Sequence, residues 1–397
     1  MRTYLELLRL PRVAAALTGS LVGRLHESML SFAVILLISP VHGYAGSGAV
    51  LAAAGIGQSV GAPLWGRRAD RSGHARVLLV TAAAQAVALL VLSRVQGEVL
   101  PAVLAGAVVG FVTPPLTPAV RAAVPRLVPA ARSSAAYALE STLQELVFVA
   151  GPLVAGAVAA RAGASTAFVV AAGCTLVGTV VYVLAVQGLP AGGPGSAVAQ
   201  GRGRVGLGAA VPVLVGGGAF LVVLCLQSLA VVQRVSGGGA LPSASWFLAA
   251  TSVGSLVGGL VIGPRLAAGA PPAPRMGILA AGVVPLVIGA SLPDPAGAVV
   301  LAVGSFLFGT TIAPAATTLF DRLSRTVPAG RSTEAFGWMG AAMGAGGVIG
   351  DGGGGWLLDR AGPVPVLVVA ALVAGLVSVV LPRTLAVDAP EEPAAAV

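Results

Sequence analysis

Five side chains that are charged at pH 7 lie well inside long apolar stretches of this 397-residue sequence, namely Arg24, Glu27, Glu140, Glu145 and Asp351. A charged group at the centre of a lipid bilayer costs at least about 2.5 to 3.5 kcal/mol, so each such residue is a candidate for function. Carboxylates that lose hydration there can take up and release protons. We therefore treat these five residues as candidates for proton coupling.

Arg24 and Glu27 stand three residues apart near the middle of the first apolar stretch. Residues at this spacing are neighbours on a helix, so the two charges can pair, and Ser28 and Ser31 extend the same polar face. The pair either pins this helix structurally or takes part in function, and the sequence favours neither. We expect Glu27, together with Glu145, to accept protons, with Arg24 as the counter-charge.

Glu140 and Gln144 share one face of the fifth apolar stretch, whereas Glu145 points about 100° away from Gln144. The two glutamates are therefore expected to act differently. Glu145 lies near the middle of its stretch. Glu140 lies closer to one end, where it either joins the proton-accepting residues or binds an arginine of the neighbouring loop, Arg121 or Arg132.

Asp351 stands among glycines at positions 350 and 352–355. A single carboxylate in such surroundings must border water, a cation or a partner arginine if the segment spans a membrane. Alternatively, Asp351 marks an early end of its helix.

Several other polar or aromatic side chains in the apolar stretches are candidates for a substrate cavity, which typically combines apolar walls with few polar anchors. Thr113 and Thr117 lie in a stretch interrupted by prolines, whose freed carbonyl groups must face protein or a water-filled cavity. The full set of cavity candidates is Gln144, Thr113, Thr117, Gln227, Trp246 and Thr310.

The composition is that of a membrane protein. Hydrophobic residues make up 56% and charged residues 9%, with a mean hydropathy of +0.95, whereas soluble domains carry roughly 25% charged residues. The net charge of +9 is spread thinly over separate loops, which argues against nucleic-acid binding. Two cysteines and three scattered histidines give no metal-ligand spacing, so neither a metal nor a cofactor is expected.

All 23 basic residues are arginine, and their positions alternate along the chain. Every second segment outside the apolar stretches, counting the two chain ends, holds arginines, eighteen in total, and the intervening segments hold only four. The positive-inside rule produces such an alternation when a chain crosses a bilayer repeatedly. The absence of lysine, beside abundant Ala, Gly, Val and Arg, suggests a GC-rich bacterial genome. We expect a multi-pass protein of the bacterial cytoplasmic membrane with both termini in the cytoplasm.

Twelve apolar stretches are long enough to span roughly 30 Å of hydrocarbon as helices. The sequence therefore predicts an all-α membrane protein. The stretches cover residues 13–39, 47–66, 77–95, 99–120, 135–160, 165–187, 209–232, 242–263, 276–292, 296–320, 335–358 and 363–381.

A Gly-, Pro- and Arg-rich break divides these spans six and six. Such a division predicts two parallel repeats with a binding cavity between them near the membrane midplane. We assign residues 1–188 and 209–385 to two six-helix bundles, 189–208 to a cytoplasmic linker, and 386–397 to a disordered tail. Glycines recur in the second, fifth, eighth and eleventh spans, so we expect these four helices to touch one another.

The gap between spans two and three contains Gly66, Asp70, Arg71, Gly73 and Arg76. At this spacing these residues resemble the signature loop of the major facilitator superfamily. In that family the loop latches the two halves on the cytoplasmic side, and its members usually act as monomers. The resemblance covers essentially the whole chain and implies the twelve-helix major facilitator fold.

Span five contains Gly151, Pro152 and Gly156, which is similar to a motif of the antiporters of this family. This similarity implies export. Span four, however, lacks the arginine that drug exporters of the family usually carry there, which puts proton coupling of the best-known kind in doubt.

We therefore expect a secondary transporter that moves a small amphipathic organic compound across the bilayer by alternating access, as a proton-coupled exporter. The alternative on the same scaffold is a proton symporter or a facilitator that imports a small metabolite. The sequence contains neither a Gly-x-Ser-x-Gly nor a His-Glu-x-x-His motif, which argues against an enzyme.

Overall fold

A computed structural model of the chain describes residues 6–188, 210–236, 243–262, 273–326 and 332–385. Every regular element in these ranges is a helix. The predicted linker, 189–208, and the predicted tail, 386–397, lie outside the described residues.

The helices fall into two consecutive sets. The first half of the chain contains α2 (Pro11–Ser72), α3 (His74–Leu92), α4 (Val99–Phe111), α5 (Leu116–Leu127), α6 (Ala130–Ala162) and α7 (Ala164–Val186). The second half contains α8 (Val211–Ser236), α9 (Ala244–Val257), the π-helix η4 (Gly258–Ile262), α11 (Ala273–Ser291), α12 (Ala296–Thr326), α13 (Ser332–Ala361) and α14 (Pro363–Leu385).

These helices correspond to the twelve predicted spans. The long helix α2 is two spans, because Gly43 leaves helical geometry at φ 69° and ψ −179°. The fourth span is split into α4 and α5 at residues 112–115, where Pro114 and Pro115 cannot donate to a helix. Within the described residues, six helices are long and apolar enough to cross a membrane, and four shorter apolar helices accompany them. The all-α fold with twelve spans in two bundles is confirmed.

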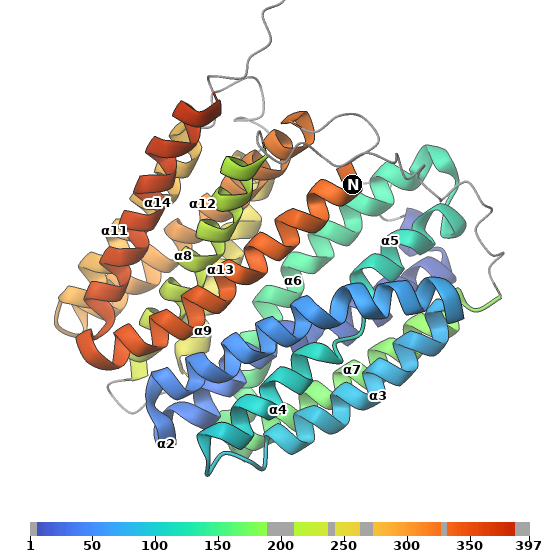
Figure 1. Ribbon diagram of the computed structural model, residues 1–397, viewed down its shortest axis with the longest axis horizontal. Coiled ribbons are helices and arrows are strands. Elements are labelled where there is room, and N and C mark those ends of the chain that lie inside the picture. Colours follow the sequence, from blue (N-terminus) through green and yellow to red (C-terminus); the bar gives the residue numbers. More distant parts are fainter. Residues whose placement is uncertain (1–5, 189–209, 237–242, 263–272, 327–331, 386–397) are drawn as a thin grey trace, which may run out of the picture.

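Figure 1 shows the two halves side by side, α2 to α7 in blue to green and α8 to α14 in yellow-green to red. Each half packs mainly within itself, and α2 packs on α13 and α6 on α9 across the boundary. We name the two ends of the bundle after glycines of α2. The chain reverses at Gly43, Gly163 and Gly362 at the Gly43 end, and between α2 and α3 at the Gly73 end.

Backbone contacts at glycine repeat in the same pattern in both halves. In the first half, a side chain on Gly57 would overlap the carbonyl of Ala107, and one on Gly110 would overlap that of Ala54. In the second half the corresponding pairs are Gly254 with Phe306 and Gly309 with Thr251. Each half therefore joins its second and fourth spans backbone to backbone, as expected for packing in lipid.

The prediction that the glycine-rich spans two, five, eight and eleven touch one another is only partly correct. The pairs α2–α13 and α6–α9 do pack together. Most of the glycines, however, face other helices of their own half, for example Gly254 against α12 and Gly350 against Val222 of α8. Small residues indicate that another helix backbone can approach closely, but they do not indicate which helix it is.

The two halves meet toward the Gly43 end. Contacts between α2 and α13 run from Tyr44 beside Gly355 to Ser59 beside Gly344. Beyond that point Val60 and Trp338 are exposed, and no atom of another described helix lies within 4 Å of the position of a side chain at Gly340. The seam between α2 and α13 is thus closed at the Gly43 end, and these two helices separate toward the Gly73 end.

A larger side chain at a glycine contact should loosen one half. We expect Gly57→Ala and Gly254→Ala each to lower the melting temperature of the detergent-purified protein by a few degrees, because overpacking costs about 1 to 3 kcal/mol. The matched control is Gly173→Ala on α7, where no atom of another described helix lies within 4 Å of the added methyl group. This control should not lower the melting temperature, and equal melting of all three variants would contradict the packing described.

Candidate functional site

A buried ion pair joins the first span to the fifth. The Nη1 atom of Arg24 on α2 lies 2.9 Å from the Oε1 atom of Glu140 on α6, and both side chains are only 3% exposed. Short charge-assisted hydrogen bonds of this kind are among the strongest in proteins. The pair fixes these helices against each other at a depth where lipid would otherwise surround them.

The partner of Arg24 differs from the helix-spacing prediction. Glu27 lies within electrostatic reach of Arg24 but makes no hydrogen bond with it among the described residues. Glu140, which was also considered as a partner of a loop arginine, reaches Arg24 instead. Spacing along one helix cannot show that a neighbouring helix brings a carboxylate closer. We call Arg24, Glu27 and Glu140 the Arg24 cluster.

A small cavity adjoins the ion pair. Its walls include Ser20, Arg24, Glu140 and Gln144, together with apolar side chains of α2 and α6. The Nε atom of Arg24 and the hydroxyl of Ser20 are buried, and neither has a hydrogen-bond partner in the described structure. Buried polar groups normally have partners, so these two atoms are available to water or to a bound molecule. Of the predicted cavity residues, Gln144 alone lines this space.

The seam between α2 and α6 continues one turn from the ion pair. Ser28 donates a hydrogen bond to the carbonyl oxygen of Val147 at 2.7 Å. Gly151, of the antiporter-like motif, packs directly on the Ser28 side chain, so any larger residue there would displace it. His26 is buried, and its Nδ1 atom contacts the carbonyl oxygen of Gly23 on the same helix at 2.6 Å.

The adjoining face of α2 carries polar groups that are open to their surroundings. Glu27 is partly exposed, and Ser31, one turn further on, is exposed. In a membrane span such a face is expected to border a water-filled space rather than lipid. The side chain of Glu145 lies outside the described residues, so its predicted role stays a prediction.

Asp351 lies within α13, so the predicted early helix end is wrong. Its carboxylate lies close to the side chain of Cys225 of α8. Its backbone carbonyl contacts Gly48 of α2 in the other half. Asp351 is therefore a partly buried acid directly at the boundary between the halves.

The remaining predicted cavity residues are dispersed. Gln85 donates a hydrogen bond to Thr113 at 3.1 Å inside the first half, and Gln227 reaches Thr251 at 3.5 Å inside the second. The hydroxyl of Thr310 donates a hydrogen bond to the carbonyl oxygen of Leu307 on its own helix. Thr117 lies on α5 and is partly buried. Polarity within an apolar stretch thus did not separate cavity residues from residues that satisfy each other within a half.

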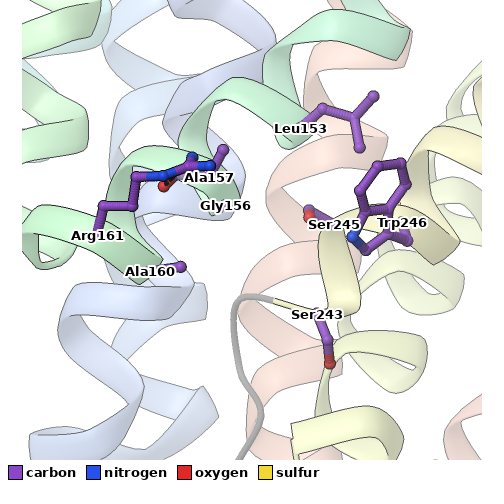
Figure 2. Close-up of a pocket in the computed structure, with 8 residues that line it drawn as sticks. All are labelled: Leu153, Gly156, Ala157, Ala160, Arg161, Ser243, Ser245 and Trp246. Atoms are coloured by element: carbon purple, nitrogen blue, oxygen red, sulfur yellow. Dashed lines mark hydrogen bonds between the residues drawn. The ribbon is translucent and has the colours of Figure 1, made fainter.

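Trp246 lines a cleft between the halves at the Gly43 end. The cleft has a volume of about 550 Å³ and lies between α6 and the first turn of α9. Figure 2 shows Arg161 and Gly156 on the α6 side and Trp246 with two serines on the α9 side. Deeper in the bundle, Ser252 of α9 donates a hydrogen bond to the carbonyl of Phe148 at 3.1 Å.

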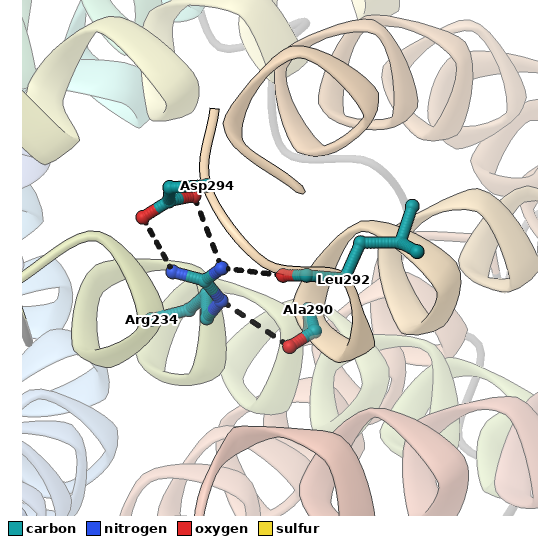
Figure 3. A network of polar contacts seen from close by, with 4 residues as sticks. All are labelled: Arg234, Ala290, Leu292 and Asp294. Atoms are coloured by element: carbon teal, nitrogen blue, oxygen red, sulfur yellow. Dashed lines mark hydrogen bonds and ion pairs between the residues drawn. The ribbon is translucent and has the colours of Figure 1, made fainter. Parts of the chain in front are cut away.

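A second arginine at the Gly43 end has a purely structural arrangement. Arg234 closes α8 onto the turn between α11 and α12, with Asp294 at 3.1 and 3.3 Å and the carbonyls of Ala290 and Leu292 at 3.2 and 2.8 Å. Figure 3 shows the guanidinium held from both sides. The network lies wholly in the second half, so it does not join the halves.

The predicted latch loop lies at the Gly73 end. Gly73 separates α2 from α3 at φ 93°, a conformation that favours glycine. Among the described residues, no atom other than those of adjacent backbone lies within 4 Å of the position of a side chain at Gly66 or Gly73, and Arg76 is exposed. The side chains of Asp70 and Arg71 lie outside the described residues, so the latch itself stays a prediction.

Within the described residues, no group of three His, Cys, Asp or Glu side chains is arranged to hold a metal ion. The polar chemistry of these residues is therefore that of an ion pair, single carboxylates and hydroxyl groups in an apolar bundle.

The chain was compared with known families and structures. The family model described as Major Facilitator Superfamily matches residues 16–351. No curated protein sequence matched. Solved structures with a similar fold include the nucleoside transporter NupG (14% identity, 93% of this chain and 99% of that one, TM-score 0.72), a peptide transporter POT (15%, 93% and 94%, 0.71), and a bacterial homologue of the iron transporter ferroportin in an inward-facing state (14%, 94% and 99%, 0.72).

The buried pair should show strong energetic coupling. We expect Arg24→Met and Glu140→Leu each to lower the free energy of unfolding by about 3 to 5 kcal/mol, because each leaves a buried charge without its partner. The double variant should lose less than either single variant, which a double-mutant cycle by SDS titration would measure. Arg161→Met, which removes an exposed arginine, is the control. Additive losses would contradict the coupling.

Proposed function

The chain belongs to the major facilitator superfamily, and we propose that it exports a small amphipathic organic compound in exchange for protons, through the Arg24 cluster. As a member of this family it is a multi-pass membrane protein and a secondary transporter, not an enzyme. The observation that carries the proposal is the buried Arg24–Glu140 pair beside a third charged group, Glu27.

The charges of the cluster support proton binding. One arginine faces two glutamates, so the cluster has a net charge of −1 when both carboxylates are ionised and zero when one proton is bound. A net charge in a low-dielectric site is costly, whereas a neutral cluster with a satisfied ion pair is much less so. One proton therefore changes the energy of the site sharply. Arg24 can then bind whichever glutamate stays ionised.

The cluster is placed to affect the boundary between the halves. Arg24 and Glu140 join α2 to α6, and these two helices contact α13 and α9 of the other half. We propose that residues 1–188 and 209–385 move as two bodies, and that protonation of the cluster shifts their equilibrium. Glu145 and Asp351 stay additional candidates for proton binding, Asp351 because it lies at this boundary.

The arginine alternation supports an orientation with the Gly73 end in the cytoplasm. In that orientation the seam between α2 and α13 is closed on the outer side and open on the inner side. Export is supported by the antiporter-like residues Gly151, Pro152 and Gly156, of which Gly151 packs against α2 and Gly156 lines the outer cleft. We propose the bacterial cytoplasmic membrane as the location and a monomer as the working unit.

Proton flux tests the coupling. A substrate would first be found by thermal-shift screening of an antibiotic and metabolite panel. In proteoliposomes, a pH gradient should then drive its movement, and Glu27→Gln or Glu140→Gln should lower gradient-driven transport at least about tenfold, because neither variant can cycle a proton at that position. Glu98→Gln, an exposed glutamate at the Gly43 end, is the matched control.

Two outcomes would contradict this proposal. Transport that is indifferent to the pH gradient would identify a facilitator. Accumulation of the substrate inside cells that express the protein, rather than its depletion, would identify a symporter.

A further inference from the structure

A carboxylate of the second half caps a helix of the first half at the Gly43 end. Asp359, near the end of α13, accepts hydrogen bonds from the backbone amides of Tyr44 at 2.9 Å and Ala45 at 2.7 Å. Each amide binds a different carboxylate oxygen. Asp359 is more than 300 positions away from Tyr44 and Ala45 in the sequence and belongs to the other half, so this contact exists only while the two halves touch.

The break at Gly43 makes these amides available. Because α2 leaves helical geometry there, a new helix begins at Tyr44, and its first amides lack acceptors within the helix. The same helix end carries the positive end of the helix dipole, which favours a carboxylate. Asp359 thus supplies both the missing acceptors and the matching charge, and it does so from the other half.

The surrounding residues fit this contact closely. Gly43 has φ 69°, and a side chain there would lie 2.7 Å from the Oδ2 atom of Asp359. One turn earlier on α13, a side chain on Gly355 would overlap the carbonyl of Tyr44. The Tyr44 hydroxyl lies close to the side chain of Ser236 at the end of α8. Two helices of the second half therefore hold the start of this one helix.

The charged residues near this contact interact with other groups and take no part in it. Arg360, the next residue, lies over the ring of Trp356 at 4.1 Å. Asp294, another carboxylate at the Gly43 end, binds Arg234 within the second half. Of these two carboxylates, only Asp359 joins the two halves.

We propose that Asp359 is the latch that holds the Gly43 end closed, and that its release is required for this end to open during transport. Opening must break both hydrogen bonds and leave the first amides of the second α2 segment to water. Asp359 therefore stabilises the state seen here over the opposite one. It is a positioning residue that acts on the equilibrium between states and does not touch the substrate.

The inference rests on alternating access, and it is independent of proton coupling and of substrate identity. Hydrogen exchange followed by mass spectrometry on the purified full chain tests it without substrate or gradient. A failure here would therefore leave the flux experiment unaffected, and the reverse also holds.

In Asp359→Asn we expect amides of residues 44–48 to exchange about tenfold faster or more, because charge-assisted hydrogen bonds are lost. Residues 60–72 of α2 at the Gly73 end should exchange more slowly, because the opposite state closes that end. Asp359→Glu, which keeps the charge, should restore part of the protection, and Asp294→Asn, which removes a carboxylate at the same end, should leave both regions unchanged.

Three results would overturn the proposal. Faster exchange at residues 44–48 with no change at 60–72 would make Asp359 a local helix cap only. Unchanged exchange at both ends would show that the contact does not hold the halves. Faster exchange over the whole of both halves in Asp359→Asn and Asp359→Glu alike would show a general loss of structure.

Discussion

Lipid offers no hydrogen-bond partners and little reason for helices to associate, and this constraint determines how each half of the protein is built. In this protein the helices of each half associate through direct backbone contacts at glycine residues. Gly57 and Gly110 in the first half occupy the same relation as Gly254 and Gly309 in the second. Because each half is held by contacts that leave no room for adjustment, a change of state must take place at the boundary between the halves. That boundary is closed at one end, where Asp359 binds the start of a helix from the other half.

Charged side chains inside this apolar bundle each need a partner of opposite charge or access to water. Arg24 and Glu140 satisfy one another, and Arg234 and Asp294 do the same near the surface of the second half. Glu27 is the exception within the Arg24 cluster, since it has no hydrogen bond among the described residues. An ion pair with one additional carboxylate is a poor way to stabilise a membrane protein, because buried charges are costly even when paired. This arrangement is what supports the proposal that a proton neutralises the site during part of the transport cycle.

The sequence predicted the fold well and the pairing of the site poorly. Apolar length and arginine alternation determine the spans, and Pro114 and Pro115 predicted the break in the fourth span, because each of these signals is local in the chain. The predicted pairing of Arg24 with Glu27 was wrong, because spacing along the sequence shows only which residues are neighbours on the same helix. Glu140 lies on a different helix, α6. Nothing in the sequence predicted the contact of Asp359. This residue follows the end of an apolar stretch, where carboxylates are common, and its contact depends on a break in the backbone of α2 more than 300 residues away.

The central claim is that a proton on the Arg24 cluster changes the separation of the halves. Spin labels at the exposed positions Arg68 of α2 and Trp338 of α13, after both native cysteines are replaced, would measure this separation at the Gly73 end. The account predicts a distance distribution that shifts between about pH 5 and about pH 8, and that no longer shifts when Glu27→Gln and Glu140→Gln are combined. A distribution that is the same at both pH values in the otherwise unchanged protein would contradict it.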